Sequence, residues 1–107
     1  MSGFVQIIEY QSSRIDDMRA LNDQWRQEHP DMGPLRVTVT EDLDRRGTYL
    51  SIVEFASKED AMRNNGDPLT QEFASRMQAL ADGPPTFRNL EVVLSEIRLD
   101  EGTRTKV

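Results

Sequence analysis

The sequence of 107 residues contains no cysteine, which excludes a disulfide framework, a thiolate metal site and a thiol nucleophile. It also has no uninterrupted apolar run near the roughly 20 residues that a membrane-spanning helix requires. Its first residues show no basic segment followed by an apolar one, as a secretion signal would. We therefore expect a cytoplasmic protein without membrane contacts.

Positive charge is scarce: the sequence has 13 lysines and arginines but 19 aspartates and glutamates, which gives a formal net charge of -6. Nucleic acids are bound largely by neutralising their phosphates, so we expect no nucleic-acid partner. Glycine-rich phosphate loops, a serine nucleophile elbow and Rossmann glycines are also missing, which excludes kinases, α/β-hydrolases and nicotinamide enzymes. Glu28, His29 and Asp31 lack the spacing of a metal site. We therefore predict neither a metal nor a cofactor.

What the sequence does have is a clear hydrophobic periodicity. Apolar residues repeat every 2 residues, as in a strand, or every 3.6 residues, as in a helix, and along the chain these repeats follow the order 2, 3.6, 2, 2, 3.6 and 2. This order predicts an α+β fold with the element order βαββαβ in one domain over residues 1–99. Nothing apolar except the terminus follows, so residues 100–107 are interpreted as a C-terminal tail. The expected strands cover residues 4–11, 35–40, 48–55 and 86–97.

Local signals mark the ends of two helical regions. Ser13 is expected to cap the first helix, which His29-Pro30 ends. Ser57 is expected to cap the second helix, and Asn64-Asn65-Gly66 breaks that helix. Asp67 and Pro68 then supply a cap and a first helical residue for its second half. The sequence thus predicts a divided second helical region.

Three of the four expected strands carry apolar residues on both faces, whereas the strand at 35–40 alternates with polar residues and is typical of a sheet edge. Two helices cover only one face of such a sheet. The uncovered face would be a larger apolar patch than a monomer normally tolerates, so we expect a homodimer that packs sheet to sheet. The alternative is a curled monomeric sheet with scattered exposed apolar side chains.

The stretch from the third strand into the second helical region reads Phe55-Ala56-Ser57, Asp60-Ala61-Met62, Asn65, Pro68 and Phe73. With the element order, it resembles the dimeric α+β barrel superfamily, in particular its antibiotic-biosynthesis-monooxygenase-like group. The resemblance implies a ferredoxin-like subunit with a four-stranded antiparallel sheet. Phe55 replaces the commoner Trp, and Asn65 stands where a His is frequent. Haem-degrading members use an Asn on the first strand, where this chain has Gln6, so haem degradation is disfavoured.

Only one side chain in the sequence, His29, has an unperturbed pKa near neutrality, and it lies one turn after Trp25. We predict His29 as the catalytic base of a pocket between sheet and helices, so that His29→Ala abolishes turnover without unfolding the dimer. The alternative is a cation at the helix C-terminus. Trp25 could likewise be a core residue instead of a ligand-binding one. The residues predicted to bind the ligand are Gln6, Tyr10, Trp25, Asn65 and Phe73.

Polar residues on otherwise apolar strands have two possible roles. Gln6, Glu54, Asn89 and Glu91 either line a cavity or pair with arginines across strands or across the dimer.

The resemblance implies a small-molecule-binding protein, with a cofactor-independent monooxygenase-like or isomerase-like activity on a small apolar or aromatic compound. The alternative is a non-catalytic structural, sensing or interaction module with a filled core. A cavity of the usual ligand-pocket size, about 300 Å³ or more, would favour the former, and a solid interior the latter.

Overall fold

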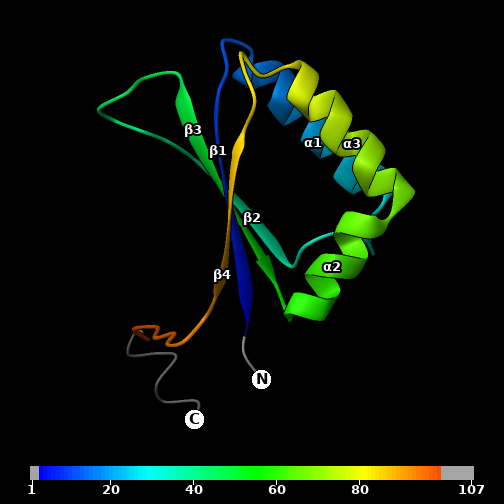
Figure 1. Cartoon of the computed structure of the whole chain (residues 1–107), viewed down its shortest axis with the longest axis vertical. Coiled ribbons are helices and arrows are strands. Elements are labelled where there is room, and N and C mark those ends of the chain that lie inside the picture. Colours follow the sequence, from blue (N-terminus) through cyan, green and yellow to red (C-terminus); the bar gives the residue numbers. More distant parts are fainter. Residues whose placement is uncertain (1–2, 100–107) are drawn as a thin grey trace.

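The computed structural model describes residues 3–99 and has the expected element order (Figure 1). No helix in this range is long and apolar enough to cross a membrane. The elements are β1 (Phe4–Gln11), α1 (Ile15–Glu28), β2 (Arg36–Glu41), β3 (Thr48–Phe55), α2 (Lys58–Gly66), α3 (Pro68–Ala79) and β4 (Thr86–Glu91).

The four strands form one antiparallel sheet in the order β2-β3-β1-β4, which confirms the predicted ferredoxin-like α+β fold. β2 lies at an edge, as its polar alternation predicted. All three helices lie on the same side of the sheet (Figure 1). β1 is central, so its residues are flanked by β3 on one side and by β4 on the other.

The strand register decides which side chains face the helices. Phe4 lies opposite Phe55 on β3, and Ile8 lies opposite Ser51. Directly opposed residues of antiparallel strands share a face, so Phe4 and Ile8 point to the same side as Phe55 and Val53. They pack with Ala61 of α2, which is only 1% exposed. This small cluster attaches α2 to one end of the sheet.

The opposite face of the sheet, which we call the open face, is also apolar at its centre. Ile7 lies opposite Ile52, and Val5 lies opposite Leu90. No helix among residues 3–99 covers this face, and Leu90 is 45% exposed. The β2–β3 hairpin and the chain after β4 project on this side (Figure 1).

The predicted division of the second helical region is confirmed. Ser57 accepts a hydrogen bond from the backbone N–H of Asp60 at 3.1 Å, so it caps α2. Asp67 accepts one from the N–H of Leu69 at 2.9 Å and caps α3, with Pro68 at its start. α1 ends at its predicted place, with His29 as the C-cap.

The predicted cap at Ser13 is wrong. The N-cap of α1 is Arg14, whose side chain makes no capping hydrogen bond. Ser12 instead accepts a hydrogen bond from the Arg14 N–H at 2.9 Å and donates one to the Leu80 carbonyl at 2.8 Å. Ser12 is 4% exposed, and its hydroxyl joins the start of α1 to the end of the helical layer.

The last strand is shorter than predicted, because β4 ends at Glu91 and not at residue 97. Its last contact is the hydrogen bond from the Val92 N–H to the Gly3 carbonyl at 2.9 Å. β1 begins at Phe4, so within residues 3–99 the apolar alternation after Val92 pairs with no further strand. The predicted tail, residues 100–107, lies outside the described residues.

Candidate functional site

Two hollows flank α2. The larger has a volume of about 530 Å³ and lies between α2 and the β1–β4 side of the sheet; we call it the α2–β4 hollow. The smaller, of about 290 Å³, lies beside the loop that precedes β2. The α2–β4 hollow is lined by Gly3, Phe4, Lys58, Ala61, Met62, Asn65, Asn89 and Glu91.

The lining of the α2–β4 hollow combines an apolar surface with a few polar groups. Phe4, Ala61 and Met62 supply hydrocarbon, and Met62 is 63% exposed. Lys58 and Glu91 supply one charge of each sign. Ligand pockets are typically lined mostly by apolar side chains. Four of the eight residues that line this hollow are polar or charged, so its wall offers polar contacts as well as apolar surface.

Gln6 lies on the helix-facing side of β1 but does not line the α2–β4 hollow itself. Its side-chain N–H donates to the side-chain oxygen of Asn89 at 3.1 Å. This bond uses one acceptor site of that oxygen and leaves both amide N–H groups of Asn89 for a ligand. Gln6 therefore acts on this hollow by orienting Asn89.

Three of the predicted site residues form an aromatic group between α1 and α3, outside both hollows. The ring centroid of Trp25 lies 5.0 Å from that of His29 and 5.1 Å from that of Phe73. Trp25 is 8% exposed and lies against Gly33, where an added Cβ would approach its ring to 3.0 Å. Gly33 has a φ of +91°, which favours glycine. The arrangement is that of a packing contact.

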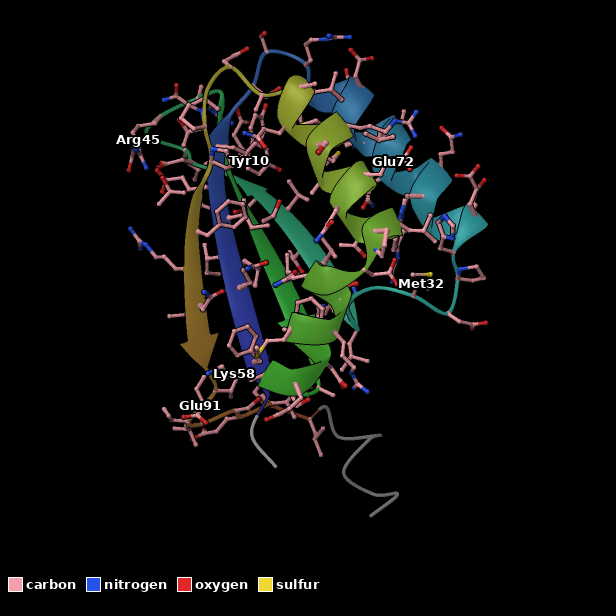
Figure 2. All side chains as sticks on the ribbon, turned by 45° about the vertical axis from the view of Figure 1, so that its right-hand side comes forward. Tyr10, Met32, Arg45, Lys58, Glu72 and Glu91 are labelled. Atoms are coloured by element: carbon pink, nitrogen blue, oxygen red, sulfur yellow. The ribbon has the colours of Figure 1, made fainter. Side chains whose placement is uncertain are left out.

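Tyr10 lies at the other end of β1. It is six residues from Phe4, or about 20 Å along a strand. Its hydroxyl lies 2.9 Å from Ser51 Oγ, and its ring stacks on Tyr49 with centroids 5.9 Å apart. Burial raises the pKa of Tyr10; the hydrogen bond with Ser51 lowers it, and Tyr49 adds a smaller upward effect. Figure 2 shows Tyr10 at the opposite end of the sheet from Lys58 and Glu91.

Three of the ten residues that line the smaller hollow are acidic. Asp31, Asp60 and Asp67 line it, together with Arg63, which forms an ion pair with Asp60. Within residues 3–99 no group of three or more histidine or acidic side chains is placed to hold a metal ion.

The structure therefore brings only part of the predicted site together. Asn65 lines the α2–β4 hollow directly, and Gln6 reaches it through Asn89. Lys58 and Met62 were missed, because an exposed lysine at a helix start and an exposed methionine one turn later carry no distinctive sequence signal. Asn89 and Glu91 did carry one, as polar residues on an apolar strand. The other predicted residues, Tyr10, Trp25, His29 and Phe73, line neither hollow.

Neither a protein-family model nor a curated protein matches the sequence. Solved structures do resemble the fold. SnoaB of Streptomyces nogalater, a cofactor-independent oxygenase, has a TM-score of 0.73 at 11% identity, and the match covers 89% of this chain and 97% of that one. Rv0793 of Mycobacterium tuberculosis has a TM-score of 0.66 at 18% identity, over 91% of this chain and 100% of that one.

A third similar structure comes from Bordetella bronchiseptica and is named provisionally as an antibiotic biosynthesis monooxygenase. Its TM-score is 0.71 at 17% identity, and the match covers 88% of this chain and 100% of that one. At such identities the likeness concerns the fold. The resemblance stated from the sequence is confirmed at that level: this chain has the ferredoxin-like α+β fold of the antibiotic-biosynthesis-monooxygenase-like group.

Proposed function

We propose that this chain binds a small molecule with a mostly apolar or aromatic body in the α2–β4 hollow. The observation that carries the proposal is the hollow itself, about 530 Å³ with Phe4, Ala61 and Met62 in its wall. Ligand pockets usually have volumes of about 300–1,000 Å³, and this one lies in that range.

The chemistry that we propose for such a ligand is a cofactor-independent oxygenase-like or isomerase-like reaction. The fold shared with SnoaB supports this class, since that protein is described as a cofactor-independent oxygenase. A reaction of this kind depends on side chains that remove a proton. Glu91 is the carboxylate in the wall of the α2–β4 hollow, whereas His29 packs beside Trp25.

A non-catalytic binding protein is the second candidate, and the position of His29 favours it. The only histidine of the chain lines neither hollow, and His29 occupies the C-cap position of α1. A cation at this position interacts favourably with the helix dipole, which is a structural role. Turnover itself separates the two candidates, because any compound that the wild-type protein converts excludes the non-catalytic one. Full turnover of that compound by His29→Ala would then remove His29 from the mechanism.

We propose further that the protein is a homodimer formed through the open face of the sheet. Val5, Ile7 and Ile52 lie there without a covering layer among residues 3–99. The chain after β4 adds apolar side chains on the same side, and Val93 and Ile97 are 92% and 82% exposed. Surface of this kind normally marks an interface.

Binding is tested with β-naphthol as an aromatic probe, followed by two-dimensional amide NMR of the wild-type protein. We expect saturable shifts of the side-chain amide signals of Asn65 and Asn89. The backbone amide signal of Asp44, in the β2–β3 hairpin, should not shift. Saturable shifts elsewhere in the absence of shifts at both asparagines would refute the site.

The matched variants for this test are two tryptophan substitutions on the helices. Met62→Trp places a large ring in the wall of the hollow and should weaken naphthol binding by about tenfold. Leu69→Trp changes a similarly exposed residue outside the hollow and should leave the affinity unchanged. Equal affinities of the two variants would argue against binding in this hollow.

A further inference from the structure

Two opposite charges stand at the α2–β4 hollow, and they come from different layers of the molecule. Lys58 is the first residue of α2, and Glu91 is the last residue of β4. Figure 2 shows both at the same end of the molecule. Both line the hollow, and within residues 3–99 neither takes part in an ion pair. They are therefore available to a ligand.

The sheet topology places the segment that leads into Lys58 and the strand that carries Glu91 on either side of β1. Lys58 follows β3 after a two-residue connection, and Glu91 lies on β4. β1 runs between these two strands, and Phe4 of β1 lies directly opposite both Phe55 and Glu91. Neighbouring strands are about 4.8 Å apart, so β3, which leads into Lys58, and β4, which carries Glu91, are separated by about 10 Å. Phe4 forms the apolar surface between them.

The remaining polar groups of the hollow are neutral amides. Asn65 lines it from α2, and Asn89 lies two residues before Glu91 on the same face of β4. Because Gln6 holds the Asn89 oxygen, Asn89 offers N–H donors beside the Glu91 carboxylate. A ligand with a single charge would have one group of like sign nearby, and a ligand without charge would leave both Lys58 and Glu91 unpaired.

We propose that the α2–β4 hollow selects a small zwitterion with an aromatic or apolar body between its two charged ends. The anionic end pairs with Lys58, the cationic end pairs with Glu91, and the body lies on Phe4 and Met62. This inference rests on the proposed function, since it assigns a ligand class to the same hollow. It goes further because it requires opposite charges at the two ends of the ligand.

A series of para-substituted benzenes tests the ligand class, because its members share one ring and differ only in charge. The series consists of para-(aminomethyl)benzoate as zwitterion, para-methylbenzoate as anion, para-methylbenzylamine as cation and para-methylbenzyl alcohol as neutral compound. Each is titrated into the wild-type protein at low ionic strength, where exposed charges are least screened. The Asn65 and Asn89 side-chain amide signals report binding. We expect the zwitterion to bind at least about threefold more tightly than each of the others, as exposed ion pairs allow.

Charge-removing variants assign the two ends of the ligand. Lys58→Gln should lower the affinity for the zwitterion and for the anion by about threefold, with no loss for the cation. Glu91→Gln should do the reverse, lowering the affinity for the zwitterion and the cation. Arg63→Gln and Glu72→Gln are the controls, because these residues lie on α2 and α3 outside the hollow and should leave all four affinities unchanged.

The outcomes separate the two proposals. Equal affinity for the neutral alcohol and the zwitterion overturns the inference and leaves the proposed binding function standing. The inference also fails if Lys58→Gln and Glu91→Gln behave like their controls. If neither β-naphthol nor any compound of the series shifts the Asn65 and Asn89 signals, both proposals fail together.

Discussion

At the residue scale, burial alters the acid–base behaviour of Tyr10. The side chain is 8% exposed, and burial disfavours its charged phenolate, so its pKa in the folded protein is raised. A raised pKa favours the protonated phenol in the folded state. The stabilising contribution is therefore fully present below the unfolded pKa, about 10, and is lost as the pH rises through the folded pKa.

We predict that the tyrosine absorbance of the folded protein has a late step, above the usual pKa of tyrosine, in which Tyr10 ionises. Tyr10→Phe should remove the late step, while Tyr49→Phe should keep it. The measurement is the near-ultraviolet absorbance of tyrosinate against pH, with circular dichroism to check that the protein remains folded. Loss of the late step in Tyr49→Phe instead would show that the assignment is wrong.

At the scale of single elements, the two halves of the second helical region depend on their own caps. Asp67 accepts the hydrogen bond from the Leu69 N–H, and its loss leaves a donor at the start of α3 unpaired. We predict that Asp67→Ala lowers the free energy of unfolding by about 1 kcal/mol. Urea denaturation followed by far-ultraviolet circular dichroism measures this change.

Ser13 supplies the matched control for that prediction. It precedes α1 as Asp67 precedes α3, but its hydroxyl donates to the exposed Asp82 carboxylate at 3.4 Å and caps nothing. Ser13→Ala should therefore change the unfolding free energy by less than about 0.5 kcal/mol, as exposed substitutions do. A larger loss in Ser13→Ala than in Asp67→Ala would contradict the assignment of the caps.

The elements were predictable from the sequence where their signals are local, and less so where they depend on a neighbour. Ser57, Asp67 and Pro68 mark helix starts through contacts within a few residues, and the structure confirms them. The strand ending at Glu91 was predicted too long, because the apolar alternation continues past Val92, whose N–H makes the last described hydrogen bond to the segment at β1. Alternation indicates a strand, but it does not show where its neighbour ends.

The candidate site was less predictable for the same reason. Its lining joins Phe4, Lys58 and Glu91, which are far apart in the sequence and meet only through the strand order and the position of α2. Helical spacing correctly placed Trp25 near His29, since residues four apart are neighbours on a helix. It could not tell that this group packs against Phe73 and not around a hollow.

At the scale of the whole molecule, the open face decides the assembly. Ile52 lies at its centre, between Ile7 of β1 and Thr38 of β2. In a sheet-to-sheet dimer this side chain would be buried, whereas in a monomer it would face water. A lysine there is tolerated by a monomer, because its aliphatic stem can lie along the sheet with the charge in solvent. In a dimer its charge would have to leave water, which is costly without a partner.

We therefore predict that the wild-type protein is a dimer at micromolar concentration and that Ile52→Lys is a folded monomer. The control is Leu69→Lys, which introduces the same charge on α3 at a residue already 44% exposed and should remain dimeric. Sedimentation equilibrium measures the masses, and circular dichroism shows whether each variant is folded. A monomeric wild type would contradict the proposed dimer directly. A dimeric, folded Ile52→Lys would instead place the subunit contact elsewhere than on the open face, since an unpaired lysine at its centre is incompatible with sheet-to-sheet packing.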